Sequence, residues 1–297
     1  MSLVIFEKIK SNQSVEKLSI IEFLQQIGVF KVALKCENDQ NEMSFVSVST
    51  LSDEFAFQCH FCNKRVSIRV GSMLFNSKHS LYEILGILCG FVSDISVQDL
   101  SNKLFISKVS VGKWYKIFRS CITNYLNHNF VQLGGPNKII EIDESVIGRR
   151  KYNAGRMLSQ QWLFGCIERY TSKIFIKCVD SRTKRELGEL IKEVIAEDTT
   201  VMSDEWPAYM SFFAESEQYK HLSVNHSRNF IDPVSGAHTQ NIERVWGKLK
   251  LRLRSKKYVR RKLIGSYIDE FCFRERFKKD ECPEYYMFIE ILKLMKN

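Results

Sequence analysis

The chain has 297 residues, 44% of them hydrophobic, and a formal net charge of +10. This length exceeds one small domain and favours two or three, with enough apolar residues for a real core. The charge favours a polyanionic partner, although many basic proteins bind nucleic acid only weakly. No run of about 18 apolar residues could span a bilayer. The first ten residues lack the long apolar stretch of a signal peptide, so we expect an intracellular protein.

The first two predicted segments are a helix and a small cysteine-containing sheet. Within residues 1–30, VEKLSIIEFLQQIGVF has apolar residues at helical spacing, which indicates a docking helix. Residues 31–78 alternate like short strands around CHFC, a Cys-x2-Cys knuckle that is half of a zinc ribbon. The upstream half supplies one cysteine and, in its partner's place, an aspartate. The candidate zinc ligands are Cys36, Asp39, Cys59 and Cys62, and His60 within the knuckle is a further candidate. The alternative is a ribbon-like fold that has lost its metal.

Residues 79–131 have three helical patterns, of which the second and third are separated by a tight turn. This spacing predicts a helix-turn-helix arrangement. The third helix would be the recognition helix, capped by Ser107 or Ser110. Its candidate DNA-binding cations lie around Trp114 and are Lys108, Lys113, Lys116 and Arg119. Helix triplets are often only structural, so the prediction depends also on the basic charge of the chain.

QLGGPNK, at 132–138, breaks any helix and predicts a domain boundary. Beyond it we expect three strands joined by turns, and then strands and helices that alternate. The expected strands cover 138–143, 162–168, 173–179, 199–203 and 221–225, and the expected helices 183–196, 205–214 and about 238–254. This is the element order of an α/β, ribonuclease H-like fold, a mixed sheet with helices on both faces. Its first and fourth strands are neighbours.

Two of these strands end in aspartates, and the last helix carries a glutamate. Asp143 ends KIIEID, Asp204 follows an apolar strand, and Glu243 lies in HTQNIERVWGKLK. Three converging carboxylates would repel one another without a divalent cation. Oxygen ligands favour Mg²⁺ or Mn²⁺, and a pair of such ions can activate a nucleophile in phosphoryl transfer. Glu141, Glu144 and Glu205 are nearby competitors, interpreted as supporting or surface groups.

A basic loop directly follows the first of these acids. Its cations are Arg149, Arg150, Lys151 and Arg156, which are well placed to bind a phosphate backbone. His226 and His238 flank the last strand and the last helix as auxiliary candidates or ordinary loop residues. Trp206 and Trp246 are expected to pack beneath the acids.

Four segments of the second half of the chain together resemble the catalytic domain of Merlin-type DDE transposases and their bacterial insertion-sequence relatives. These segments are EIDESVIGRRKYNAGR, WLFGCIER, SDEWPAY and VNHSRNFIDPVSGAHTQNIERVWGKLK. The resemblance covers about 138–277. It implies a ribonuclease H-like core, Mg²⁺-dependent DNA strand cleavage and strand transfer, and binding of element ends by the N-terminal part. Asp143, Asp204 and Glu243 match the family's three acids. Some relatives have Asn at the third place, so Asn241 stays an alternative to Glu243.

The resemblance also implies double-stranded DNA as the partner and a homo-oligomer that holds two ends together. The compartment would be the nucleus in a eukaryote, or the cytoplasm and nucleoid in a bacterium. The tail after Ser255 is first basic and then helical and aromatic, and we expect it to pack back on the core. Its last part, residues 278–297, is a separate helical tail. Two alternatives remain open: a domesticated or degenerate copy that binds DNA without cutting it, and a ribonuclease H-like nuclease that does not integrate.

Overall fold

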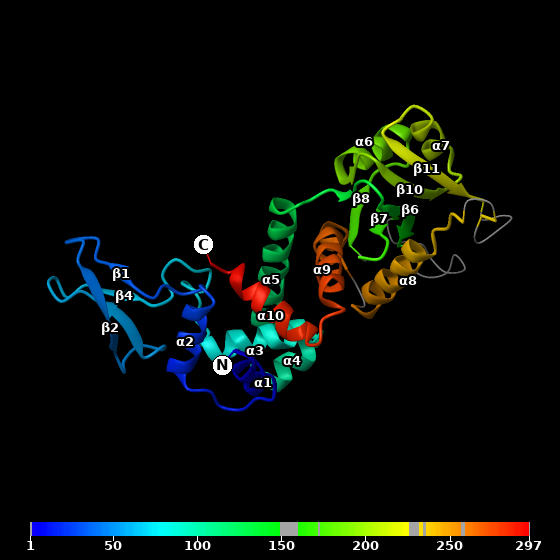
Figure 1. The fold of residues 1–297 in the computed structure, drawn as a ribbon. Helices are drawn as coiled ribbons and strands as arrows, with labels where there is room; N and C mark the ends of the chain where they lie inside the picture. The colour runs from blue at the N-terminus through cyan, green and yellow to red at the C-terminus, as the bar shows by residue number, and fades with distance from the viewer. Residues whose placement is uncertain are drawn as a thin grey trace. The chain divides into compact units, whose positions relative to one another are not determined.

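The computed structural model describes residues 2–148, 160–171, 173–225, 232–233, 236–256 and 259–296. The chain divides into two compact units (Figure 1). The first contains Met1–Tyr125 and Phe277–Asn297, and the second contains Leu126–Arg276. Within the described ranges, no helix has both the length and the apolar character that crossing a membrane requires.

The first unit contains a small antiparallel sheet. Its strands follow one another in chain order and are β1 (Leu34–Lys35), β2 (Glu42–Ser47), β3 (Phe55–Gln58) and β4 (Arg65–Ser67). Phe57 is buried, whereas Phe45 stacks on Phe55 with ring centroids 5.1 Å apart. Short strands around two cysteine-bearing turns are compatible with the predicted ribbon.

Helices from both ends of the chain form the rest of this unit. They include α1 (Ser2–Lys10), α2 (Lys17–Gln26), α3 (Leu81–Val92) and the C-terminal α10 (Pro283–Lys293). Phe288 of α10 contacts Phe6 of α1 and Phe23 of α2, with ring centroids 5.0 and 6.4 Å apart. The C-terminal tail therefore packs on the N-terminal helices, because its aromatic side complements theirs.

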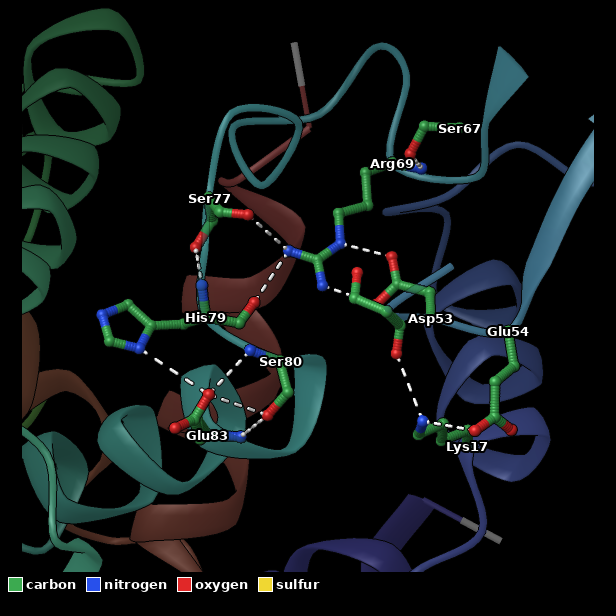
Figure 2. Close-up of polar contacts among 10 residues, drawn as sticks. Lys17, Asp53, Glu54, Ser67, Arg69, Ser77, His79, Ser80 and Glu83 are labelled. Atoms are coloured by element: carbon green, nitrogen blue, oxygen red, sulfur yellow. Dashed lines mark hydrogen bonds and ion pairs between the residues drawn. The ribbon is translucent and has the colours of Figure 1, made fainter. Parts of the chain in front are cut away.

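A buried ion pair connects the ribbon to the start of α3 (Figure 2). The guanidinium of Arg69 donates through Nε and Nη2 to Asp53, at 2.6 and 2.5 Å. Its Nη1 donates to the carbonyls of Ser77 and His79, at 3.2 and 2.9 Å. The arginine thus holds the segment after β4 against the loop between β2 and β3. Beyond this segment, Ser80 begins α3 with a reciprocal capping box.

The predicted helix triplet is confirmed as α3, α4 (Val97–Leu104) and α5 (Lys108–His128). Gly90 permits close packing of α3 against α4, because a Cβ at position 90 would lie 2.4 Å from Leu100 Cδ2. The cap of α5 is Ser107, whose Oγ accepts from the backbone N–H of Ser110 at 3.1 Å. Trp114 is buried and contributes to the core.

The second unit is built on a mixed five-stranded sheet of order β11-β10-β6-β7-β8. Its strands are β6 (Ile139–Ile147), β7 (Gln161–Glu168), β8 (Ile174–Val179), β10 (Thr199–Asp204) and β11 (Tyr219–Val224). β6, β7 and β8 are antiparallel, whereas β10 runs parallel to both β6 and β11. The first and fourth of the predicted strands are thus neighbours, as a ribonuclease H-like order requires.

Helices cover both faces of this sheet, as predicted. On one face, α6 (Lys184–Val194) and α7 (Pro207–Phe213) pack on a core that includes Ile142 and Val201. On the other, α8 (Gln240–Ser255) and α9 (Ile264–Phe277) pack on Leu163. A 3-10 turn at Arg261–Leu263 precedes α9.

The predicted linker is packed into the second unit. Within it, β5 (Leu133–Gly134) pairs in parallel with β9 (Ile195–Ala196). Gly134 has a positive φ of 91°, and a Cβ at this position would lie 2.3 Å from Thr199 Oγ1. Only glycine fits such a site without strain. The compact units divide between Tyr125 and Leu126, ahead of this glycine turn.

Candidate active site

Asp143 and Asp204 lie on adjacent parallel strands. β10 pairs with β6 in a register that joins Thr200 to Ile139 and Met202 to Glu141. Continued by two residues, this register places Asp204 opposite Asp143. Asp143 is not at the end of its strand, as the sequence had suggested, because β6 continues to Ile147 as a hairpin with β7. It lies instead where its neighbour β10 ends.

The Asp143 carboxyl is buried among other acids. Burial, followed by the charges of Glu144 and Asp204, raises the pKa of Asp143 to about 7. The indole Nε1 of Trp246 donates to Asp143 Oδ2 at 3.0 Å and opposes this shift. A carboxyl whose pKa is raised by neighbouring carboxylates is stabilised in its charged form by a cation. The carboxylate oxygens of Asp143 and its acidic neighbours are therefore ligands that suit a hard divalent ion.

Glu141 fixes the start of α8 to the sheet. Its Oε2 accepts from the backbone N–H groups of Asn241 and Ile242, at 2.8 and 3.1 Å. Its Oε1 accepts from Asn241 Nδ2 at 2.6 Å and from Arg169 Nε at 2.7 Å. A carboxylate at a helix N-terminus satisfies free N–H groups and complements the helix dipole. Glu141 is fully buried, so its interpretation as a surface group was wrong, whereas a supporting role agrees with these contacts.

These contacts distinguish the two candidates for the third acid. The Asn241 side chain is engaged by Glu141, whereas Glu243 is exposed in the first turn of α8. Glu243 Oε1 accepts from Thr239 Oγ1 at 3.0 Å. Among the described residues, Glu243 does not join the two aspartates in a group with all ligand oxygens within 4.8 Å. The structure thus pairs Asp143 with Asp204 and places Glu243 one turn before Trp246.

Of the other predicted residues near the acids, His238 lies within the described ranges. Its Nδ1 is 3.4 Å from Glu141 Oε1, and its backbone carbonyl accepts from Arg169 Nη2 at 3.0 Å. Burial and the charge of Arg169 lower the pKa of His238. Five predicted residues lie outside the described ranges: Arg149, Arg150, Lys151, Arg156 and His226.

Glu144 points to the opposite face of β6 and belongs to a network that the sequence did not reveal. Its side chain is 3% exposed and lies 3.7 Å from Arg182 Nη1. Burial raises the pKa of Glu144 to about 7, although the nearby Tyr209 hydroxyl opposes the shift. Within the described part of the chain, neither Glu144 Oε1 nor the buried Tyr209 hydroxyl reaches hydrogen-bonding geometry with a partner.

An aromatic-cation stack connects this network to Asp204. The Arg182 guanidinium lies between the rings of Trp162 and Trp206, at 4.0 and 4.1 Å from their centroids. The backbone N–H of Trp206 donates to Asp204 Oδ1 at 3.0 Å. Trp206 therefore contacts the second acid through its backbone, while its ring packs against Arg182.

Lys250 is a second residue that the sequence interpretation missed. It lies seven positions after Glu243 on α8, so helical periodicity places both on one side. Burial lowers the pKa of Lys250, and the charge of Asp143 opposes this shift. An ammonium group near the first acid could bind an anion at the same site.

The four predicted zinc ligands converge in the first unit. Cys36, Asp39, Cys59 and Cys62 place one ligand atom each within 4.8 Å of all the others. Cys36 Sγ lies 3.5 Å from Cys62 Sγ, and the Cys59 thiol donates to Asp39 Oδ2 at 3.0 Å. Tetrahedral zinc with Zn–S bonds of about 2.3 Å has sulfur–sulfur edges of roughly 3.8 Å. The cluster therefore has the size and donor types of a zinc site.

The candidate cations of the predicted helix-turn-helix differ in their exposure. Lys108, Lys113 and Lys116 are exposed along α5, whereas Arg119 is half-buried and engaged in other interactions. No acidic residue occurs between Asp99 and Glu141 in the sequence, so α5 itself carries cations and no acidic side chain.

Comparison with known proteins gives one family and a set of similar structures. Residues 132–276 match the model of the ISXO2-like transposase domain. The chain is similar to the HTLV-2 integrase catalytic core domain in complex with magnesium, in its trimeric form, with 15% identity and a TM-score of 0.30. That match covers 48% of this chain and 86% of the other. It is also similar to the catalytic core domain of BIV integrase, with 11% identity and a TM-score of 0.32. This second match covers 48% of this chain and 84% of the other. No curated protein sequence matches the chain.

Proposed function

Residues 132–276 belong to the ISXO2-like transposase domain family, and from this premise we propose that the protein cleaves DNA strands at the ends of a mobile element and transfers them to a target. The observation that carries the proposal is the pairing of Asp143 with Asp204 on adjacent parallel strands. Both acids belong to the matched domain. The resemblance to DDE transposases assigns them the roles of the first two catalytic carboxylates.

Some residues of the site would bind the metal, and others would orient these ligands. Asp143, Asp204 and Glu243 would hold Mg²⁺ or Mn²⁺, which activates a water or a 3′-hydroxyl and stabilises the leaving oxygen. Trp246 would orient Asp143 through its indole N–H, and Trp206 would orient Asp204 through its backbone N–H. Because Asn241 is bound to Glu141, we favour Glu243 as the third ligand.

The first unit would bind DNA, and its ribbon would hold zinc. Support for the zinc comes from the convergence of the four ligands, three of which are thiols. Support for duplex DNA comes from the basic face of α5, because phosphate contacts require cations at helical spacing. The predicted homo-oligomer follows from the need to hold two ends together. The basic loop at 149–156 would bind the phosphate backbone next to the acids.

The test is strand cleavage with Mg²⁺ on the sequences that flank the gene as inverted repeats. Asp204→Asn is expected to abolish cutting but to retain DNA binding, since it removes a metal ligand and no phosphate-binding cation. Asp180→Asn is the matched control, because Asp180 is an exposed aspartate after the edge strand β8. Equal cutting by wild type and Asp204→Asn would contradict catalysis at this site.

Two alternatives have distinct signatures in the same assay. A degenerate copy would bind the ends without cutting them, and the aspartate at position 39 in place of a cysteine is the feature that favours it. A nuclease that does not integrate would cut the ends without joining them to a second duplex. Joined products with wild type, lost in Asp204→Asn, would support transposition over both.

A further inference from the structure

Phe105 lies in the turn between the second and third helices of the helix-turn-helix. Phe105 is 96% exposed, the largest exposed fraction among the large exposed hydrophobic residues that the structure describes. It is also the C-cap of α4, in the left-handed conformation with φ 56° and ψ 31°. The residue after it, Ile106, is buried and fixes the turn to the core.

Both features of Phe105 are unfavourable for an isolated fold. A bulky residue with positive φ is strained where glycine or asparagine would be tolerated. An exposed aromatic ring contributes no buried area to stability. The exposed ring therefore contributes little packing to this unit, and a backbone outlier of this kind is a reason to look for a contact with a partner.

The surroundings of Phe105 indicate the kind of partner. Val109, in the first turn of α5, is 69% exposed. Lys108, Lys113 and Lys116 lie exposed along the same helix. A Cβ on Gly112 would meet nothing within 4 Å, so this glycine leaves the helix surface low between the lysines. Exposed apolar groups on the same helix and turn as exposed lysines suit a polyanion that also offers apolar edges, which describes base pairs in the major groove of duplex DNA.

We propose that Phe105 and Val109 read base edges in the major groove of duplex DNA, with the three lysines bound to the flanking phosphates. The inference rests on the proposed function in taking DNA as the partner, and adds which residues give sequence preference. The apolar feature of the major groove is the 5-methyl group of thymine, which contacts apolar side chains. The surface should therefore prefer sites with thymine at one or more positions. Helix-turn-helix docking presents this turn and the start of the third helix to the bases.

The first experiment selects preferred duplexes from a random-sequence library with the full-length wild-type protein. The proposal expects an enriched motif that contains thymine. Replacing the critical thymine by uracil removes only the methyl group and should weaken wild-type binding by roughly 10-fold. Enrichment of no motif, or of a motif insensitive to uracil, would overturn the proposal.

The second experiment compares the binding of Phe105→Gly and wild type to the selected duplex with thymine and to the same duplex with uracil. The variant should bind the thymine duplex no better than the uracil duplex, while its affinity for a scrambled duplex is unchanged. Phe105→Asn should also bind the thymine duplex no better than the uracil duplex, because asparagine tolerates the left-handed conformation as well. Val32→Ala is the matched control, since Val32 is 72% exposed in the same unit. An undiminished preference for thymine in Phe105→Gly would overturn the proposal.

Thermal unfolding separates recognition from structure. Because glycine relieves the strain of a positive φ, Phe105→Gly should have a melting temperature equal to or above that of wild type. A lower melting temperature would assign the ring a structural role and contradict the proposal. Asp204→Asn should select the same motif as wild type. A wild-type protein that prefers the thymine duplex but never cuts would contradict the proposed function and leave this inference in place.

Discussion

The indole N–H of Trp246 and the Asp143 carboxylate are joined by a hydrogen bond of 3.0 Å between α8 and β6. Trp246→Phe keeps an aromatic side chain, although a smaller one, and removes the indole N–H donor. Supporting partners of metal ligands typically contribute about 10-fold or more in metal affinity or activity. We therefore expect the Mg²⁺ concentration for half-maximal strand cleavage to rise by about 10-fold. An unchanged Mg²⁺ titration would show that the indole does not orient Asp143.

Gly165 allows Trp246 to reach that position. It pairs with Asp143 across the β6–β7 hairpin, and a Cβ there would lie 2.4 Å from the Trp246 ring. Gly165→Ala is expected to lower stability by about 1–3 kcal/mol through overpacking. Gly247→Ala is the control, because a Cβ on this helical glycine meets nothing within 4 Å and should stabilise α8. Thermal unfolding of both variants measures the difference, and equal melting temperatures would contradict the prediction.

The ion pair of Asp53 and Arg69 can be compared with an exposed ion pair close to it, and Figure 2 shows both pairs. Its side chains are 9% and 4% exposed, whereas the nearby pair of Lys17 and Glu54 is 48% exposed on both sides. Arg69→Met leaves a buried carboxylate without its partner and is expected to cost about 3–5 kcal/mol. Lys17→Met breaks the exposed pair and should cost less than about 1 kcal/mol. Denaturant unfolding of the two variants should therefore differ clearly, and similar losses would argue against the prediction.

The ribbon predicts a zinc stoichiometry of about one ion per chain, from its single four-ligand cluster among the described residues. Cys59→Ser should lose the metal, and Asp39→Cys should bind it more tightly because a thiolate is the softer ligand. Cys282→Ser is the control, since this exposed cysteine is outside the cluster. Metal analysis of the purified variants provides the measurement. Full zinc content in Cys59→Ser would rule out the proposed site.

His221 predicts a loss of stability on mild acidification. Its ring stacks on Phe213 at 4.2 Å, and Nε2 lies 2.9 Å from Ser203 Oγ. Burial lowers the pKa of His221 to about 4, from an ordinary value of 6.5. The unfolded chain therefore takes up this proton first, so the contribution of His221 to stability is constant above pH 6.5 and falls between pH 6.5 and 4.

The matched variant for this pH effect is His221→Gln, which cannot be protonated in that range. The difference in melting temperature between wild type and His221→Gln should change from pH 7.5 to pH 4.5, to the disadvantage of wild type. Parallel curves over this range would assign the acid sensitivity to other groups.

The sequence predicted the acids and the strand order because both have local signals. Apolar runs that end in aspartate indicated the strands of Asp143 and Asp204, and the element order placed them side by side, which the register supports. The contacts of Glu141 have no such signal, since they depend on where the start of α8 meets β6. One clue was available: a carboxylate inside a buried strand requires a partner.

The stack around Arg182 was beyond prediction for the same reason. Its two tryptophans come from β7 and the start of α7, which no local pattern brings together. The left-handed conformation of Phe105 likewise depends on how Ile106 is buried after the end of α4. These features follow from tertiary packing, which overrides residue preferences.

The attachment of α8 to Glu141 has a consequence for how the site would be assembled. Two main-chain N–H groups, an amide and a guanidinium all bind this one carboxylate beneath the first aspartate. The helix that carries Glu243 is thus fixed to the sheet before any ion binds, and the Glu243 side chain would have to exchange its hydrogen bond with Thr239 Oγ1 for the metal. Magnesium would then complete a scaffold that already exists, at the small entropic cost of ordering one side chain.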